Sequence, residues 1–363
     1  RHACVDLLSH LLRQGLLNPF QTVPHLFGLQ GDIGKPEIRA LSLKLLINEG
    51  EKRPDMLRQR ICAGVKNAYI FQKKVYPAKE ATAGIQKHDG EKMYYDSIFG
   101  SIFKASVITV KKQKQGFFTN LLGLFKVGGD GISTRKSKGT HFIDLPLLSF
   151  TAEVLAYLPY NSSYDPLFII FNIQSSAALE GAQHLDKMTS FLQDAGFAVD
   201  INDDIAKEDD LEMAAKSARP CRAKEATILK SRKFDLLRFQ GLCEIASSFT
   251  LLLRLKAYLQ KVYNLSETRC LEYSPDGQER NFDKFSSTIL KMPHFDSKVV
   301  GVFKHNATEK GSPRNTRDTD KNAAIHQYAE FRKWMRIEQT AGARMAESDG
   351  EDDSSTKNNL DDA

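Results

Sequence analysis

Histidine spacing and a glycine–lysine pair are the first features that suggest chemistry. The nine histidines form no H-E-x-x-H motif and no spacing with cysteine that suits a metal ion. His294 has a neighbouring carboxylate, but a surface or capping histidine is the commoner explanation. Gly34 and Lys35 match the end of a phosphate-binding loop, yet Leu29 replaces the required glycine and Pro36 the magnesium-binding Ser or Thr. The sequence therefore predicts no enzyme and no cofactor or metal site.

Clusters of basic residues form the second chemically suggestive pattern. Lys and Arg side chains that meet phosphates release counterions and give salt-dependent affinity for DNA that does not depend on its sequence. Solvation of a helix surface is the plainer explanation for any single cluster. No groove-reading motif is present, so DNA would be contacted through its backbone. The candidate DNA-binding residues are Lys52, Arg53, Arg58, Arg60, Lys66, Lys73, Lys74, Lys111, Lys112, Lys114, Arg135, Lys136, Lys138, Lys230, Arg232 and Lys233.

The net charge supports an anionic partner when the acidic C-terminal stretch is counted separately from the rest of the chain. The 363 residues carry 51 Lys+Arg and 45 Asp+Glu, a net charge of +6. Residues 345–363 hold seven acidic residues and one lysine, a net charge of −6, so residues 1–344 carry +12. A distinctly basic body makes nucleic acid a candidate partner.

The remaining composition narrows the class of protein. Hydrophobic residues make up 41% of the chain, enough for a sizeable core. Five scattered cysteines without a C-x-x-C pair indicate a reducing compartment rather than a disulfide framework. No apolar run approaches 18 residues, and Arg254 interrupts the longest, so we expect no membrane span. The chain opens on Arg1 with a helical pattern at once, so we expect no signal peptide and a fragment of a longer protein.

The elements that must position these residues are predicted to be helices. Apolar residues recur three to four positions apart over most of the chain, and proline or a capping residue stands at several helix starts. The spacing predicts helices over residues 3–16, 19–29, 38–47, 56–76, 117–125, 147–158 and 228–263.

Two segments leave the type of element less certain. Residues 167–173 form an apolar run that fits either a strand or a buried helix, and the helical neighbours favour a helix. Tyr95, Phe99, Phe103 and Val107 lie on one stripe, which predicts a further helix. No segment shows convincing strand alternation, so the fold class expected is all-α.

The order of the helices predicts a HEAT-repeat-like α-solenoid, with a non-repetitive helical domain as the alternative. Charged stretches without apolar periodicity predict a disordered insertion and a disordered acidic tail. The expected organisation is helical repeats over 1–193, the insertion over 194–224, a helical continuation over 225–307, a linker over 308–321, a terminal amphipathic helix over 322–340 and the tail over 341–363.

An ordered series of short motifs resembles the C-terminal region of the cohesin loader, the Nipped-B (adherin, sister chromatid cohesion protein 2) family. The matches cover roughly residues 10–175 and 245–300 and include no catalytic signature. They are Gln14-Gly15-Leu16, Asn18-Pro19, Pro24, Leu26, Ile38-Arg39, Ala63-Gly64, Tyr69, Phe71-Gln72, Leu121-Leu122, Leu124-Phe125, Pro159-Tyr160, 166–169, 251–256, 272–275 and His294-Phe295.

The resemblance implies a fold and a function. Family members are hook-shaped HEAT-repeat proteins of the nucleus that load cohesin onto chromatin. They grip duplex DNA and cohesin's kleisin subunit and stimulate the ATPase of its structural-maintenance-of-chromosomes subunits. A tetratricopeptide-repeat subunit binds an N-terminal region of the family that we expect to be missing from this chain. The insertion lengths differ, so the resemblance assigns no individual contact residue.

Two other functions fit the same helical pattern. A HEAT-like scaffold or transport receptor would bind peptides without DNA, and its affinity would survive high salt. A purely structural hook end would bind neither. A DNA titration at two salt concentrations separates the DNA-binding function from the peptide scaffold.

Overall fold

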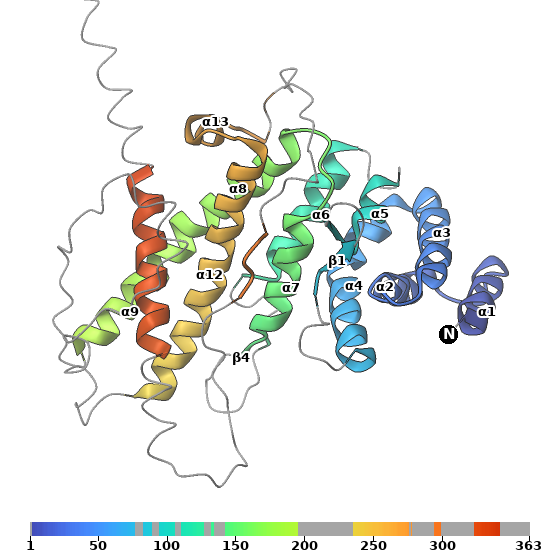
Figure 1. The fold of residues 1–363 in the computed structure, drawn as a ribbon, viewed down its shortest axis with the longest axis horizontal. Coiled ribbons are helices and arrows are strands. Elements are labelled where there is room, and N and C mark those ends of the chain that lie inside the picture. The colour runs from blue at the N-terminus through green and yellow to red at the C-terminus, as the bar shows by residue number, and fades with distance from the viewer. Residues whose placement is uncertain are drawn as a thin grey trace, which may run out of the picture.

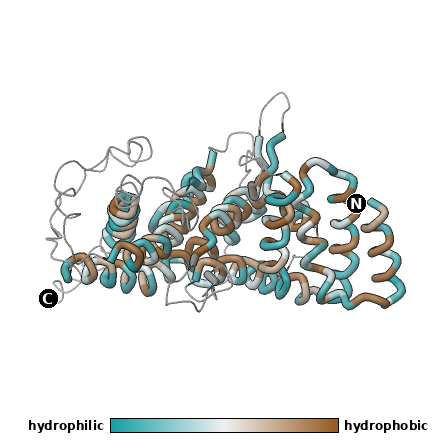
Figure 2. The backbone as a smooth tube through the Cα atoms, turned by 90° about the horizontal axis from the view of Figure 1, so that it is seen from below, coloured by the Kyte–Doolittle hydropathy of each residue, from teal (hydrophilic) through white to brown (hydrophobic). Residues whose placement is uncertain are grey.

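A single row of packed helices makes up the described chain. The structure is a computed structural model that describes residues 2–76, 83–88, 94–105, 110–126, 132–133, 142–194, 235–275, 277, 294–298 and 323–341. Figure 1 shows the helices side by side along the long axis, from α1 (His2–Arg13) at one end to α9 (Ala182–Asp194) and a helix over residues 323–341 at the other. Figure 2 shows hydrophobic and hydrophilic positions alternating along the helices, as expected when each buries one face. The predicted all-α solenoid is confirmed.

Capping residues and prolines set the first helix starts. In α2 (Pro19–Leu29), the Asn18 side chain accepts a hydrogen bond from the Phe20 N–H, and proline stands in the first turn. Prolines also open α3 (Pro36–Lys52) and α4 (Pro54–Val75). α2 packs against both α3 and α4. A Cβ at Gly64 of α4 would lie 2.4 Å from the Phe27 Cβ, so glycine is required for this close approach.

The helix predicted from the stripe of Tyr95, Phe99, Phe103 and Val107 is wrong at its start, where strands are found instead, and Val107 lies outside the described residues. β1 (Ile85–His88) pairs antiparallel with β2 (Tyr94–Ser97), and only then does α5 (Gly100–Lys104) begin. A glycine stands at position 100, where the chain passes from β2 into α5, because a Cβ there would lie only 2.7 Å from the Asp96 carboxylate. A second short pair joins β3 (Ile132–Ser133) to β4 (Phe142–Ile143).

The middle of the row contains α6 (Lys111–Gly123), α7 (Leu145–Ala156) and α8 (Tyr164–Ser176). The Asp144 side chain caps α7 by accepting from the Leu147 N–H. The apolar run over 167–173 lies inside α8, so the preference for a helix there is confirmed. A five-residue π-helical turn, η2 (Ala177–Gly181), joins α8 to α9.

The last part of the row is built on α12 (Leu236–Tyr263), which is followed by the short α13 (Glu267–Leu271). By length and composition α12 could cross a membrane, but 72% of its most apolar window is buried inside the protein. It packs against α7, α8 and α9, so its apolar character is explained as that of a core helix.

The helix over 323–341 covers α12 with both apolar and charged contacts. Phe331 is fully buried against Phe249. Arg254 pairs with Glu330, and the Lys256 ammonium contacts both Glu267 (2.7 Å) and Glu338 (2.8 Å). Lys256 is only 4% exposed, so this ion cluster is an interior connection between α12, α13 and the last helix.

A short segment over 294–298 lies against α7. The Phe295 N–H donates to the Tyr157 hydroxyl, and Ser297 donates to the Glu153 carboxylate. Burial raises the pKa of Glu153. His294 contacts the Tyr95 ring at 5.2 Å between centroids, an aromatic contact that accounts for its position.

Several predicted segments lie outside the described residues. They are the charged insertion beyond Asp194, residues 228–234 of the long helix, the linker over 308–321 and the tail beyond residue 341.

Candidate nucleic-acid interface

The basic residues around the start of α4 differ in how much they are already engaged. Lys52 is 61% exposed although it pairs with Glu49 at 2.8 Å. Arg53 is exposed at the junction between α3 and α4. Arg58 pairs with Asp55, and the Arg60 guanidinium lies 4.4 Å from the centroid of the Phe20 ring. Lys52 and Arg53 are therefore the members best placed to meet a partner.

The three lysines at the start of α6 divide into an exposed one, one held by an aromatic ring and a carbonyl, and one paired with a buried carboxylate. Lys112 is exposed. Lys111 lies over the Tyr164 ring at 4.3 Å, and its ammonium donates to the Gly277 carbonyl at 3.3 Å. Lys114 pairs with Asp165 at 3.0 Å, with side chains 21% and 5% exposed. Lys114 holds α6 to α8, which leaves Lys111 and Lys112 for the surface.

α4 and α6 run in the same direction, which brings these two clusters to one edge of the row. A Cβ at Gly116 would lie 2.2 Å from the Arg58 Cδ, and one turn further on Cys62 donates to the Asn120 carbonyl. α4 and α6 pack directly against each other. We call this edge the helix-start edge and define it by Lys52, Arg53, Lys111 and Lys112.

The other candidates on α4 lie away from that edge. Lys73 and Lys74 are exposed in its last turn. A 22-residue helix is about 33 Å long, so these lysines lie at the opposite end. Lys73 lies 5.7 Å from the centroid of the Tyr69 ring. Lys66, in the middle of α4, is half-buried and engaged.

Six candidates cannot be placed. Arg135, Lys136, Lys138, Lys230, Arg232 and Lys233 lie outside the described residues. In the part of the chain that the structure does describe, no group of three His, Cys, Asp or Glu residues could hold a metal ion.

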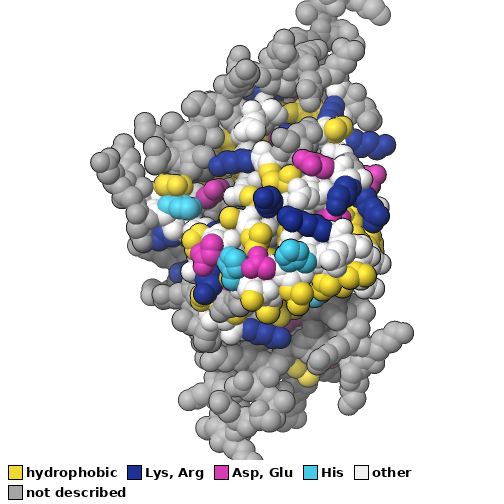
Figure 3. All heavy atoms as spheres, turned by 90° about the vertical axis from the view of Figure 1, so that its right-hand side faces the viewer, with side chains coloured by type: hydrophobic (Ala, Val, Ile, Leu, Met, Phe, Trp, Pro, Cys, Tyr) yellow, Lys and Arg dark blue, Asp and Glu magenta, His cyan; other side chains and the backbone are white. Residues whose placement is uncertain are grey.

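Figure 3 shows the end of the row at the α1 side, where basic, acidic, histidine and apolar side chains are interspersed. Leu7 of α1 and the following Leu16 are 60% and 67% exposed. Both signs of charge are present on this end face, so it is not a uniformly basic surface.

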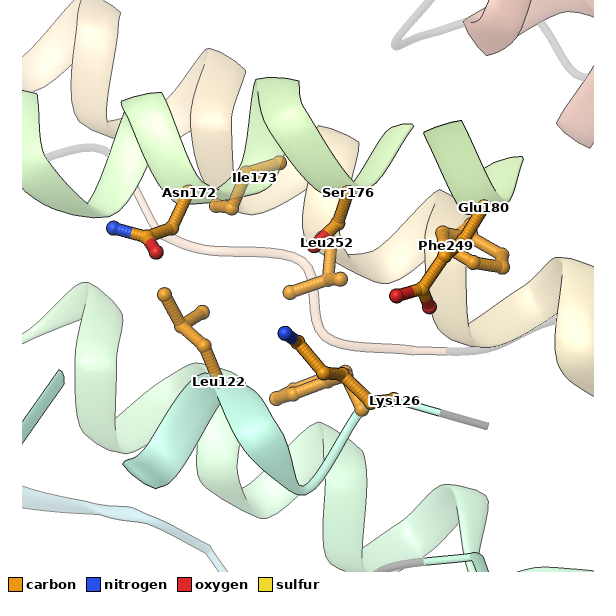
Figure 4. A pocket seen from close by; sticks show the side chains of 9 residues that line it. Leu122, Lys126, Asn172, Ile173, Ser176, Glu180, Phe249 and Leu252 are labelled. Carbon is orange, nitrogen blue, oxygen red and sulfur yellow. The ribbon is translucent and has the colours of Figure 1, made fainter. Parts of the chain in front are cut away.

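A small crevice lies between α6, α8 and α12. Its cavity volume is about 10 Å³, and Phe125, Ile173 and Leu252 are among its apolar lining residues. Figure 4 shows Lys126 and Glu180 on two sides of it, from the residues just after α6 and the π-helical turn. This space admits about one water molecule, so it is not a groove for a peptide.

Sequence reasoning missed the partners that separate these roles. Asp165 stands 51 residues after Lys114, and Gly277 stands 166 residues after Lys111. Periodicity along the chain does not indicate contacts over such separations. The sequence therefore predicts one cluster of three lysines, although their contacts in the fold differ.

Comparison with known proteins confirms the resemblance found in the sequence. The family described as "Sister chromatid cohesion C-terminus" matches residues 1–176. Nipped-B-like protein A of Danio rerio is 26% identical over 186 residues, which is 51% of this chain and 7% of that protein. The Nipped-B-like proteins of Mus musculus and Homo sapiens are each 22% identical over 364 residues, 92% of this chain and 12% of their own length. The chain thus spans about an eighth or less of these relatives.

Proposed function

We propose that the chain is the C-terminal part of a nuclear, chromatin-associated cohesin loading factor, because residues 1–176 match the family described as "Sister chromatid cohesion C-terminus". In this role it is a non-enzymatic scaffold that binds cohesin and duplex DNA and promotes the loading of cohesin onto chromatin. The observation that carries the proposal is the family match, supported by similarity to Nipped-B-like proteins over 92% of the chain.

The helix-start edge is the surface we assign to DNA. Four exposed or partly exposed cations lie there: Lys52 ends α3, Arg53 precedes α4, and Lys111 and Lys112 open α6, which packs against α4. The family match extends over all of these elements. Lys and Arg at such a surface would contact phosphates without reading bases. The resulting affinity would be independent of sequence and strongly dependent on salt.

Cohesin is the protein partner of the proposed function, through its kleisin and structural-maintenance-of-chromosomes subunits. ATP would be hydrolysed by the partner, which agrees with the failed phosphate-loop match at Gly34 and Lys35. The chain would act by binding the ATPase's engaged state better than its open state, since only differential affinity shifts an equilibrium. The tetratricopeptide-repeat subunit would bind the relatives' N-terminal region, outside this sequence.

A DNA mobility-shift titration at 50 mM and 200 mM salt tests the DNA-binding part. If about four to five phosphates are contacted, affinity should fall roughly 10²- to 10³-fold between the two conditions. Affinity that is unchanged by salt, or no binding at 50 mM salt, would contradict it.

A HEAT-like peptide-binding scaffold or transport receptor without DNA is the alternative function. Its affinity for a peptide would survive high salt, so the same titration separates it from DNA binding.

A further inference from the structure

An exposed Ser-Pro turn lies against the helix-start edge. Ser274 is exposed, and its carbonyl accepts from the Gly277 N–H at 3.1 Å, which closes a turn with Pro275 in the second position. The chain contains a second Ser-Pro pair, Ser312-Pro313, outside the described residues. Ser274 is therefore the Ser-Pro site whose surroundings the structure defines.

The turn is anchored by α8 and α6. The Tyr164 hydroxyl donates to the Pro275 carbonyl at 2.7 Å. The Lys111 ammonium lies over the Tyr164 ring and donates to the Gly277 carbonyl. These contacts fix the Ser-Pro turn beside a lysine without covering the serine.

The Ser274 Cβ lies close to Gly277, the residue whose carbonyl Lys111 contacts. A Cβ built at Gly277 would lie 3.8 Å from the Ser274 Cβ. The Lys111 ammonium is 3.3 Å from the Gly277 carbonyl oxygen. Because the turn hydrogen bond joins Ser274 to Gly277, a phosphate on Ser274 would be within the reach of the flexible Lys111 side chain.

We propose that Ser274 is a phosphorylation site for a proline-directed protein kinase and that Lys111 pairs with the phosphate. In the transfer, the Ser274 Oγ bonds to the γ-phosphorus of ATP, the bond from that phosphorus to the bridging oxygen of ADP breaks, and the hydroxyl proton passes to the kinase's base. The new group carries about −1.5 to −2 charges at neutral pH, which exceeds the single charge of Lys111.

Phosphorylation would reverse the local charge at one end of the helix-start edge. If that edge contacts DNA, which rests on the proposed function, the phosphate would lower DNA affinity by removing Lys111 and repelling the DNA backbone. The modification and its contact with Lys111 do not themselves depend on DNA binding, so the two can be tested separately.

The test uses the full chain carrying Ser312→Ala, so that Ser274-Pro275 is the remaining Ser-Pro site. A proline-directed kinase with ATP and magnesium should add one phosphate to Ser274, located by mass spectrometry. Adding Ser274→Ala or Pro275→Ala should abolish that incorporation. No phosphate on Ser274, while the same kinase modifies a Ser-Pro control peptide, would overturn the proposal.

Phosphorus NMR then tests the contact with Lys111. A nearby cation favours the doubly charged phosphate and lowers its second pKa, ordinarily about 6. We expect a pKa about 0.3–0.7 unit higher after Lys111→Gln, and a smaller change after the matched Lys112→Gln. Equal pKa values with and without Lys111 would overturn the pairing.

A DNA titration of the phosphorylated and unphosphorylated forms completes the experiment. We expect affinity to fall about threefold to tenfold on phosphorylation. A phosphate that pairs with Lys111 but leaves DNA affinity unchanged would uphold the modification site and contradict the DNA-binding role of the helix-start edge.

Discussion

The same residue types perform opposite tasks at the helix-start edge and at the junction between α12 and the last helix. At the edge, Lys112 and Arg53 are exposed, and Lys52 keeps 61% of its side-chain surface although it pairs with Glu49. At the junction, Lys256 is 4% exposed and contacts two carboxylates. The cations at the edge are accessible to a partner, while Lys256 at the junction is paired with carboxylates inside the protein.

This difference teaches how net charge must be interpreted in a helical row. A buried lysine that is fully paired contributes little field outside the protein, whereas an exposed one attracts a polyanion. Lys114 resembles Lys256 at the junction rather than the exposed cations of the edge, because its ammonium pairs with the nearly buried Asp165. The basic body is thus a mixture of structural cations and cations available for binding.

Lys256→Met should have the largest effect on stability. The substitution would leave Glu267 and Glu338 without their shared cation, and a broken buried pair costs about 3–5 kcal/mol. Urea unfolding should therefore show a free energy of unfolding lower by about 3 kcal/mol. Lys74→Met, at an exposed position, is the matched control and should change it by less than about 0.5 kcal/mol. Equal losses in the free energy of unfolding for the two variants would contradict the division between structural and exposed cations.

Lys114→Met should come next and tests whether this lysine is structural. It would leave the Asp165 carboxylate, 5% exposed, without its ion-pair partner, at a cost of about 2–3 kcal/mol. Thermal or urea unfolding measures this loss, and Lys112→Met provides the control from the same helix turn. A Lys114 variant that keeps its stability but loses DNA affinity would place Lys114 with the binding residues instead.

A smaller, pH-dependent effect is expected from His184 at the junction. Burial against Phe249 and Phe331 lowers the pKa of His184, whose Nε2–H donates to the Leu242 carbonyl. Because the unfolded chain then binds more protons below the ordinary pKa of about 6.5, stability is present above that value and lost as pH falls. Between pH 7.5 and 5.5, the wild type should lose up to about 1 kcal/mol relative to His184→Gln. Parallel pH profiles of the two proteins would contradict this.

Local signals predicted most of the helices. Asn18 and Asp144 each cap the helix that the sequence placed after them. The single helix predicted from the stripe at Tyr95 was wrong, because Tyr95 lies in β2, Phe99 in the turn that follows and Phe103 in the short α5. The pairing of β2 with β1 depends on register with another segment, and Gly100 allows the chain to turn close to Asp96. Periodicity within one segment does not carry that information.

The candidate interface was less predictable than the fold. Sequence reasoning identified Lys111, Lys112 and Lys114 as one cluster, because they are neighbours in the chain. Asp165 and Gly277 come from distant segments: Asp165 pairs with Lys114 and the Gly277 carbonyl accepts from Lys111, while Lys112 stays exposed. The parallel course of α4 and α6, which joins two clusters into one edge, also follows only from tertiary packing.

The most direct test compares DNA binding by two charge-reversal variants that alter opposite ends of α4. One variant changes Lys52, Arg53 and Lys112 to Glu at the helix-start edge, and the other changes Lys73 and Lys74 to Glu. Affinity for a duplex and its salt dependence are measured for both. The account predicts that the first variant loses at least about tenfold in affinity, and that the slope of log affinity against log salt falls by about one per lost phosphate contact, while the second changes little. Unchanged affinity and slope in the first variant, or an equal loss in the second, would contradict it.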